Sequence, residues 1–257
     1  MFGWLRKRTA ARAIPQDLWQ AVLERYSFIA AQPPAQLERL RGLAAQFLAT
    51  KEFHGANGLV ITDKVALAIA AQAVLPVLTL GLGWYDDFVG IVVHPDEVLA
   101  RRTVTDESGI VHQYDEVLTG EAMEGGPVML SWHDVDSAGA TADDGYNVVI
   151  HEFIHKIDMR DGAPDGCPPL RSREARRAWL AVMQAEYDAF REKVIIAERF
   201  GGVPPWLDAY AAEGIDEFFA VACEGYFVNR ARFEADFPAL VPLFDSFFGM
   251  DAGSSPA

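Results

Sequence analysis

Residues 143–162 read DDGYNVVIHEFIHKIDMRDG, and inside this stretch His151, Glu152 and His155 form the pattern HEFIH. Residues four apart on a helix differ by only about 40° around its axis, so both imidazoles can reach one cation. Glu152 projects about 100° away from His151, beside such a cation, where a carboxylate suits a general base acting on water. Two neutral imidazoles, a carboxylate and one open position favour zinc, Zn²⁺.

The alternative is an ordinary helix that happens to carry two histidines. The residues around them are apolar, namely Val148, Val149, Ile150, Phe153, Ile154 and Ile157. Two histidines on this helix would be buried without an evident partner, and burying an unpaired polar group costs several kcal/mol. A metal ion would satisfy both side chains, so the pattern favours the metal site.

A catalytic metal site needs a third protein ligand. The extended pattern HExxHxxGxxH would require glycine at Asp158 and histidine at Asp161, so the chain departs from it at both positions. Asp161 remains a weak candidate, because without the glycine a sharp turn after the helix is disfavoured. Asp158 lies on the same helix face as both histidines, where it would either orient an imidazole or face water as a helix-end carboxylate.

A second segment, LDAYAAEGIDEFFAVACEGYF at residues 207–227, offers better candidates. Glu213, Glu217 and Glu224 fall near one stripe of a predicted helix whose other faces are aromatic and aliphatic. Like charges buried together need a cation or donors to compensate them. The pattern therefore predicts carboxylates presented to a positive centre, but it does not choose among the three. Cys223, on the same helix, is adequately explained as a small buried hydrophobe.

Composition excludes several classes of protein. Acidic residues outnumber Lys and Arg 37 to 22, which gives a net charge of -15 and argues against a nucleic-acid partner. Two cysteines do not make a disulfide framework, and no apolar segment follows the basic residues near the start as in a secretory signal. The most apolar run, 65–84, is interrupted by polar residues and proline, so we expect a buried helix and not a membrane span. These features predict a cytoplasmic protein.

Periodicity predicts a single α+β domain over residues 1–257, with an N-terminal helical layer, a small mixed sheet and flexible ends at 1–14 and 250–257. Helices are expected at 15–31, 34–53, from Thr62 to near Pro76, and at 146–159, 171–200, 213–228 and 233–248. Strands are expected at 88–94, 111–118 and 127–132, and a loop at 134–145.

Four segments together resemble the Mlc titration factor A family: HEFIHKIDMRDG, FLATKEFHGANGLVITDKVALAIAAQA, GLGWYDDFVGIVVHP and DAYAAEGIDEFFAVACEGYF. The resemblance covers about residues 15–250 and includes the lysine after HEFIH. It implies a bacterial cytosolic zinc metallopeptidase with a zincin-like fold, whose catalytic region is similar to that of anthrax lethal factor. In that family a tyrosine precedes the ligand glutamate by seven residues, as Tyr210 precedes Glu217. The resemblance thus implies that His151, His155 and Glu217 bind zinc, that Glu152 is the base and that Tyr210 stabilises the transition state.

The resemblance also implies aminopeptidase-like activity on short peptides, and a possible partner, a transcriptional repressor of the Mlc type. A non-catalytic protein that titrates such a repressor is the alternative, although a pure binding module has no need of Glu152. We expect a peptide substrate to extend along the strand at 127–132, which precedes the HEFIH helix, and Pro127 suits an edge strand.

Overall fold

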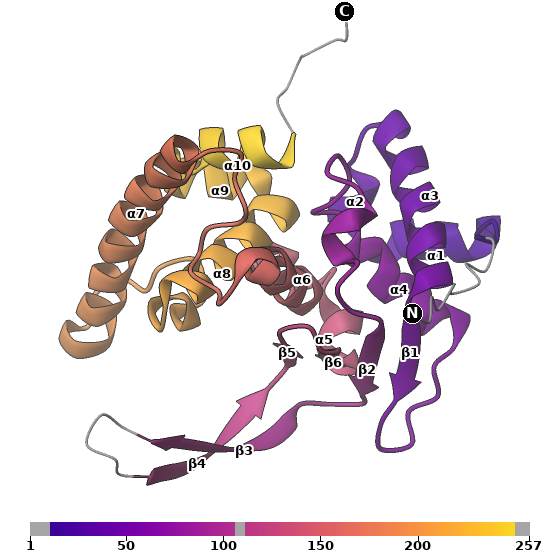
Figure 1. The fold of residues 1–257 in the computed structure, drawn as a ribbon, viewed down its shortest axis with the longest axis horizontal. Coiled ribbons are helices and arrows are strands. Elements are labelled where there is room, and N and C mark those ends of the chain that lie inside the picture. The colour runs from indigo at the N-terminus through magenta and orange to yellow at the C-terminus, as the bar shows by residue number, and fades with distance from the viewer. Residues whose placement is uncertain (1–10, 106–110, 250–257) are drawn as a thin grey trace, which may run out of the picture.

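The computed structural model describes residues 11–105 and 111–249 of the 257-residue chain. It is a mixed α and β structure in which the N-terminal helices lie on one side, the C-terminal helices on the other, and a small sheet and a central helix between them (Figure 1). The sequence predicted flexible ends at 1–14 and 250–257. Of these, residues 1–10 and 250–257 lie outside the described residues. Ile14, within the first of those ends, is buried in the core.

The N-terminal layer was correctly predicted as helical. It consists of α1 (Gln16–Arg25), α2 (Ser27–Ala30), α3 (Pro34–Thr50) and α4 (Asp63–Ala73). Thr62 caps α4 as expected, because its side chain accepts a hydrogen bond from Val65 N at 3.3 Å. The single helix predicted over 15–31 is wrong at Tyr26, whose backbone is extended. Its hydroxyl, buried, donates to Val135 O at 3.1 Å, so a tertiary contact interrupts the helix.

The sheet has four strands in the order β1-β2-β6-β5. They are β1 (Glu52–Gly55), β2 (Gly90–His94), β6 (Val128–Ser131) and β5 (Gly120–Ala122). β6 pairs in parallel with β2 and antiparallel with β5. The expectation that the strand at 127–132 is an edge was therefore wrong, since β6 is paired on both sides. The outer strand next to it is β5.

Other segments also differ from expectation. A separate antiparallel hairpin joins β3 (Val98–Thr105) to β4 (Val111–Leu118), of which only β4 was predicted. The predicted loop at 134–145 contains the end of α5 (Trp132–Ser137) and a short 3-10 turn, because Ser131 caps α5 through Asp134 N. The helix predicted over 233–248 is two helices, α9 (Arg230–Asp236) and α10 (Val241–Phe248). Pro238 lies between them and has no N–H to continue the first.

The central helix, α6 (Val148–Asp158), carries the HEFIH pattern and is buried at every position. Asn147 caps it by accepting from Ile150 N at 2.9 Å and donates to Gln72 of α4 at 2.8 Å. Phe153 extends from α6 into a cluster of rings, with centroids 5.0 Å from Tyr85 and 5.6 Å from Phe47. The capping and packing fix the position of α6 before any ligand is considered.

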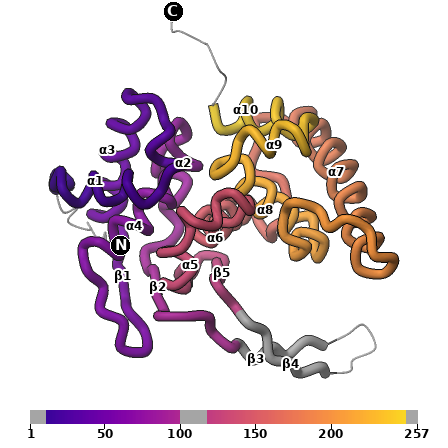
Figure 2. The backbone as a smooth tube through the Cα atoms, turned by 180° about the vertical axis from the view of Figure 1, so that it is seen from behind, coloured from indigo at the N-terminus to yellow at the C-terminus, as the bar shows by residue number. Residues whose placement is uncertain are grey.

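The C-terminal half packs on the other side of α6, as both views show (Figures 1 and 2). A long amphipathic helix, α7 (Arg173–Phe200), covers α8 (Ile215–Val228), which lies against α6. Phenylalanines of α8, α9 and α10 pack together, and the Phe233 and Phe244 rings stack at 5.6 Å. Among the described residues, no helix combines the length and the apolar character that crossing a membrane requires.

Lys156 of α6 is fully buried and joins the helix to the edge of the sheet. Its ammonium group donates to Met123 O at 2.7 Å and to Gly126 O at 3.2 Å, in the turn between β5 and β6. It also lies 3.7 Å from an Asp87 carboxylate oxygen and 4.6 Å from the centre of the Phe88 ring. The lysine that follows HEFIH is therefore a structural residue that fixes the β5–β6 turn.

We expect Lys156→Met to lower the free energy of unfolding by about 2–4 kcal/mol, because methionine keeps the volume but removes the buried ammonium group that donates to the Met123 and Gly126 carbonyls and faces Asp87. Urea denaturation measures the change. Lys64→Met, at an exposed position of α4, is the matched control and should leave the midpoint nearly unchanged. Equal midpoints for the two variants would contradict the role of Lys156.

Candidate metal centre

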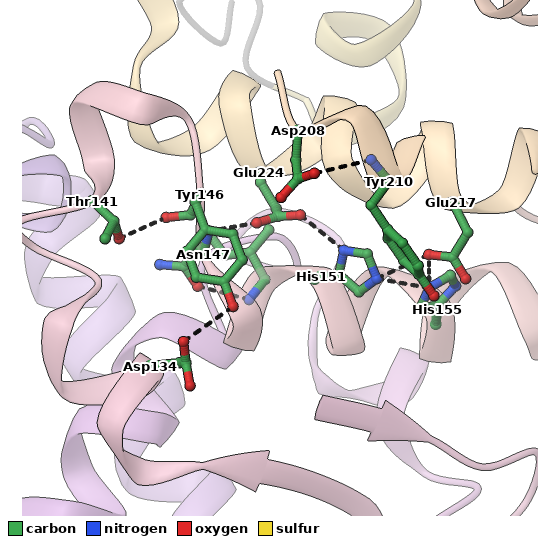
Figure 3. A network of polar contacts seen from close by, with 11 residues as sticks. Asp134, Thr141, Tyr146, Asn147, His151, His155, Asp208, Tyr210, Glu217 and Glu224 are labelled. Atoms are coloured by element: carbon green, nitrogen blue, oxygen red, sulfur yellow. Dashed lines mark hydrogen bonds and ion pairs between the residues drawn. The ribbon is translucent and has the colours of Figure 1, made fainter. Parts of the chain in front are cut away.

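Two of the candidate residues lie one turn apart on α6, as the sequence predicted. The Nε2 atoms of His151 and His155 face each other at 3.1 Å (Figure 3). Both side chains are about nine-tenths buried. A proton held between the two nitrogens would form one hydrogen bond and leave no place for a further ligand. A metal ion can accept a lone pair from each nitrogen, so the arrangement is better suited to a metal ion.

Glu217, in the first turn of α8, completes the group. Its Oε2 atom lies 3.1 Å from His151 Nε2 and 3.2 Å from His155 Nε2. A tetrahedral ion with bonds of about 2.0–2.1 Å holds neighbouring ligand atoms about 3.3 Å apart. The three atoms therefore have the spacing of one triangular face of such a site, and the fourth position faces away from all three ligands. Among the described residues these three are the group able to hold a metal ion.

Glu224, two turns further along α8, contacts the other ring nitrogen of His151 and not the Nε2 atoms that Glu217 approaches. Its Oε1 accepts from His151 Nδ1 at 2.8 Å, and its Oε2 accepts from the backbone N–H of Asn147. It is almost completely buried, and burial raises its pKa. A carboxylate bound to Nδ1 fixes the tautomer that leaves Nε2 free for a metal. Sequence reasoning placed Glu224 on the correct helix face but did not find this role, which the seven-residue spacing from Glu217 could have indicated.

The two aspartates after the histidines do not join the metal centre. Asp158 accepts from the backbone N–H groups of Asp165, Gly166 and Cys167, at 3.1, 2.8 and 3.0 Å. It shapes the loop after α6, and neither earlier interpretation, imidazole orientation or a solvent carboxylate, is right. Asp161 is exposed and lies outside the metal-capable group. Glu213 is exposed and precedes α8, so the helix begins two residues later than predicted.

Glu152 lies beside the triangle and is 5% exposed. Burial raises the pKa of Glu152 to about 7, with the Glu217 and Glu224 carboxylates adding to the rise and the two histidines opposing it. A carboxyl group with a pKa near neutrality can both accept and return a proton. Gly120 of β5 lies directly against this carboxylate, a contact that sequence reasoning missed.

Tyr210 lies in a short 3-10 helix, Ala209–Ala212, before α8. Asp208 fixes this turn by accepting from Tyr210 N at 2.9 Å. The Tyr210 ring reaches over α6, with its centre 6.2 Å from that of His151, and remains 39% exposed (Figure 3). It is the most accessible of the predicted site residues and lies between the site and solvent.

Two cavities meet at this group. The larger, of about 560 Å³, is lined by Thr119, Asp134, Tyr146 and Asp208 as well as by His151 and Glu152. The smaller, of about 160 Å³, lies towards the end of α6, and its lining includes Glu121, Ala122, Asp216 and the three metal-capable residues. Gly120 and Tyr210 line both cavities. The potential metal position is therefore open to a molecule that extends in two directions.

Comparison with known proteins finds similarity over almost the whole chain. The model of a family described as glucose-regulated metallo-peptidase M90 matches residues 1–249. An uncharacterized protein of Synechocystis sp. is 34% identical over 250 residues, which cover 96% of this chain and 89% of that protein. Mlc titration factor A of Yersinia pestis is 31% identical over 252 residues, covering 98% of this chain and 91% of the relative.

The geometry ranks three carboxylates by their effect on metal affinity. Glu217→Ala should abolish stable binding of a divalent ion, since two protein ligands remain. Glu224→Ala should weaken binding by about 10–100-fold, because the imidazole loses its orienting partner. Asp161→Asn should bind as the unchanged protein does. Competition with a chromogenic chelator measures all three, and loss of metal in Asp161→Asn with retention in Glu217→Ala would reverse the assignment.

Proposed function

Because the chain belongs to the glucose-regulated metallo-peptidase M90 family, we propose that it is a zinc-dependent peptidase that removes residues from the amino end of short peptides. The observation that carries the proposal is the triangle formed by two histidine nitrogens and a Glu217 oxygen, 3.1–3.2 Å apart, with a buried carboxyl group beside it. Two imidazoles and one carboxylate are a ligand set of catalytic zinc. In this proposal the domain is zincin-like.

Each residue then has a defined role. His151, His155 and Glu217 hold the zinc ion, which supplies a Lewis acid that polarises the scissile carbonyl. Glu152 takes a proton from the attacking water and returns it to the leaving amine as the C–N bond breaks. Tyr210, whose ring extends over the site, donates a hydrogen bond to the oxygen that becomes negative, a contact worth up to about 3–4 kcal/mol in comparable sites.

The arrangement of the two cavities supports cleavage near the amino end. We propose that the substrate adds to the outer edge of β5, the last strand of the sheet in the described residues, and antiparallel addition is the more stable of the two directions. Thr119, before β5, lines only the larger cavity, and Ala122, at its end, lines only the smaller one. An antiparallel peptide then has its amino end in the smaller cavity, where the carboxylates of Glu121 and Asp216 attract an ammonium group.

We also propose that the protein acts in the cytoplasm. Both cysteines, Cys167 and Cys223, are free and buried. A chain that keeps its thiols reduced suits a reducing compartment.

The catalytic proposal is tested with an alanine anilide. The purified protein should contain about one zinc ion per chain and lose hydrolysis when a chelator removes it. Glu152→Gln should keep the zinc and lower kcat by about 100-fold or more, since it removes the proton acceptor but not a ligand. An N-acetylated anilide should be a poor substrate because it lacks the ammonium group. Full activity of Glu152→Gln would refute the mechanism, and equal cleavage of the acetylated substrate would refute the aminopeptidase assignment alone.

A second function, in another class, is supported by the name of the Yersinia relatives, Mlc titration factor A. We propose that this chain also binds a repressor of that kind, on a surface other than the zinc cleft. A narrow cleft that takes an extended peptide does not fit a folded repressor. With a net charge of -15, the protein should prefer a partner that presents a basic surface.

The two functions should separate in one variant. Glu152→Gln should lower kcat for hydrolysis by about 100-fold or more, because it removes the proton acceptor. Since the Glu152 side chain is only 5% exposed, the same change should leave the affinity for purified repressor within about twofold of that of the unchanged protein. Binding of the protein to immobilised repressor measures the affinity, and repeating the measurement at several salt concentrations shows how far the affinity depends on charge. Loss of repressor binding by the folded, zinc-loaded variant would mean that the partner enters the cleft.

A further inference from the structure

Gly120, the first residue of β5, occupies a position where a side chain has no room. A Cβ atom built on it would lie 2.3 Å from Glu152 Oε1, 2.6 Å from its Cγ and 2.7 Å from its Cδ. Real Cβ atoms essentially never approach another heavy atom to less than 3.0 Å. Any residue other than glycine at position 120 therefore forces the strand, the helix or the Glu152 side chain to move.

The backbone itself does not require glycine at this position. Eight described glycines have a positive φ, and Gly120 is not among them. Its conformation is one that alanine adopts readily, and glycine within a strand is normally unfavourable. The contact that a Cβ would make with the Glu152 side chain gives a steric reason for glycine here.

The strand and the helix are both held in place. β5 pairs with β6 through Gly120, Glu121 and Ala122, and Lys156 binds the turn that joins the two strands. α6 is buried at every position. A Cβ at position 120 would thus displace the side chain of Glu152 before it displaced either element.

We propose that Gly120 is a positioning residue, whose missing side chain holds open the place from which the Glu152 carboxylate acts beside His151 and His155. The inference rests on the proposed peptidase function only for the consequence in kcat. Its structural part, that position 120 and Glu152 compete for one space, is independent of any activity.

Another explanation for the glycine is that substrate passes close to the strand. Gly120 lines both cavities, so a side chain there could also obstruct the peptide. The two explanations differ in kinetics. Obstruction raises KM, whereas displacement of Glu152 lowers kcat with KM nearly unchanged.

The first test is a double-mutant cycle on thermal stability, with Gly120→Ala, Glu152→Ala and the two together. In the presence of Glu152, Gly120→Ala should lower Tm by about 3–10 °C, as expected for overpacking in a chain of this size. In the Glu152→Ala background the same change should cost little, because the space is vacant. Gly90→Ala, in β2 of the same sheet, is the matched control, since its Cβ would meet only Pro127 Cβ at 3.4 Å. It should leave Tm nearly unchanged.

The second test measures zinc content and steady-state hydrolysis of the alanine anilide. Gly120→Ala should keep the zinc, lower kcat by about 100-fold and leave KM within about twofold, and it should add no further loss to Glu152→Gln. Should Gly120→Ala alone fail to fold while the double variant folds, the shared space is confirmed.

Three outcomes would overturn the proposal. Gly120→Ala could lower Tm equally with and without Glu152, or both Gly120→Ala and its combination with Glu152→Ala could fail to fold. In the third outcome, Gly120→Ala raises KM and leaves kcat intact. If the unchanged protein hydrolyses nothing, the peptidase function fails, and the Tm cycle still decides whether Gly120 and Glu152 share one space.

Discussion

The metal-capable site depends on one electrostatic constraint: three atoms that carry lone pairs point at the same buried point. The Nε2 atoms of His151 and His155 and an oxygen of Glu217 are 3.1–3.2 Å apart, in a site where the side chains are largely removed from water. Such a group is costly unless a positive charge is placed at its centre. Everything that holds α6 and α8 in register therefore also maintains a site for a cation.

Two carboxylates of α8 illustrate how closely that register is fixed. Glu217 and Glu224 are seven residues apart, which places them on one helix face about 10 Å from each other. The first reaches the Nε2 atoms of both histidines, and the second reaches Nδ1 of His151 and the backbone N–H of Asn147. Because Asn147 also caps α6, Glu224 joins the start of that helix to the orientation of its first histidine. The same contacts stabilise the fold and select the tautomer needed for metal binding.

Much of this site was predictable from sequence, because helical spacing alone places His151, Glu152 and His155. Choosing Glu217 required a family resemblance, since Glu213 and Glu224 lie near the same stripe and only tertiary packing separates their roles. The short strands β1 and β5 were missed because EFHG and GEA are too short to show alternation, and they become strands by pairing with neighbours. Pro127 suggested an edge strand, but it precedes the first paired residue of β6, where its missing N–H costs no ladder bond.

The position of β6 inside the sheet determines which strand borders the site. With β6 inside the sheet, the strand beside the cleft is β5, and α6 holds β5 from two directions. Lys156 binds the carbonyls of the β5–β6 turn, while Glu152 fills the space left by Gly120. In the proposed peptidase, this one helix therefore supplies two nitrogens able to bind the metal and the proton acceptor, and it also supports the strand offered to a peptide. The proposed reaction requires the scissile bond to be aligned with all of these groups at once, and attaching them to one buried helix reduces the number of independent motions that could misalign them.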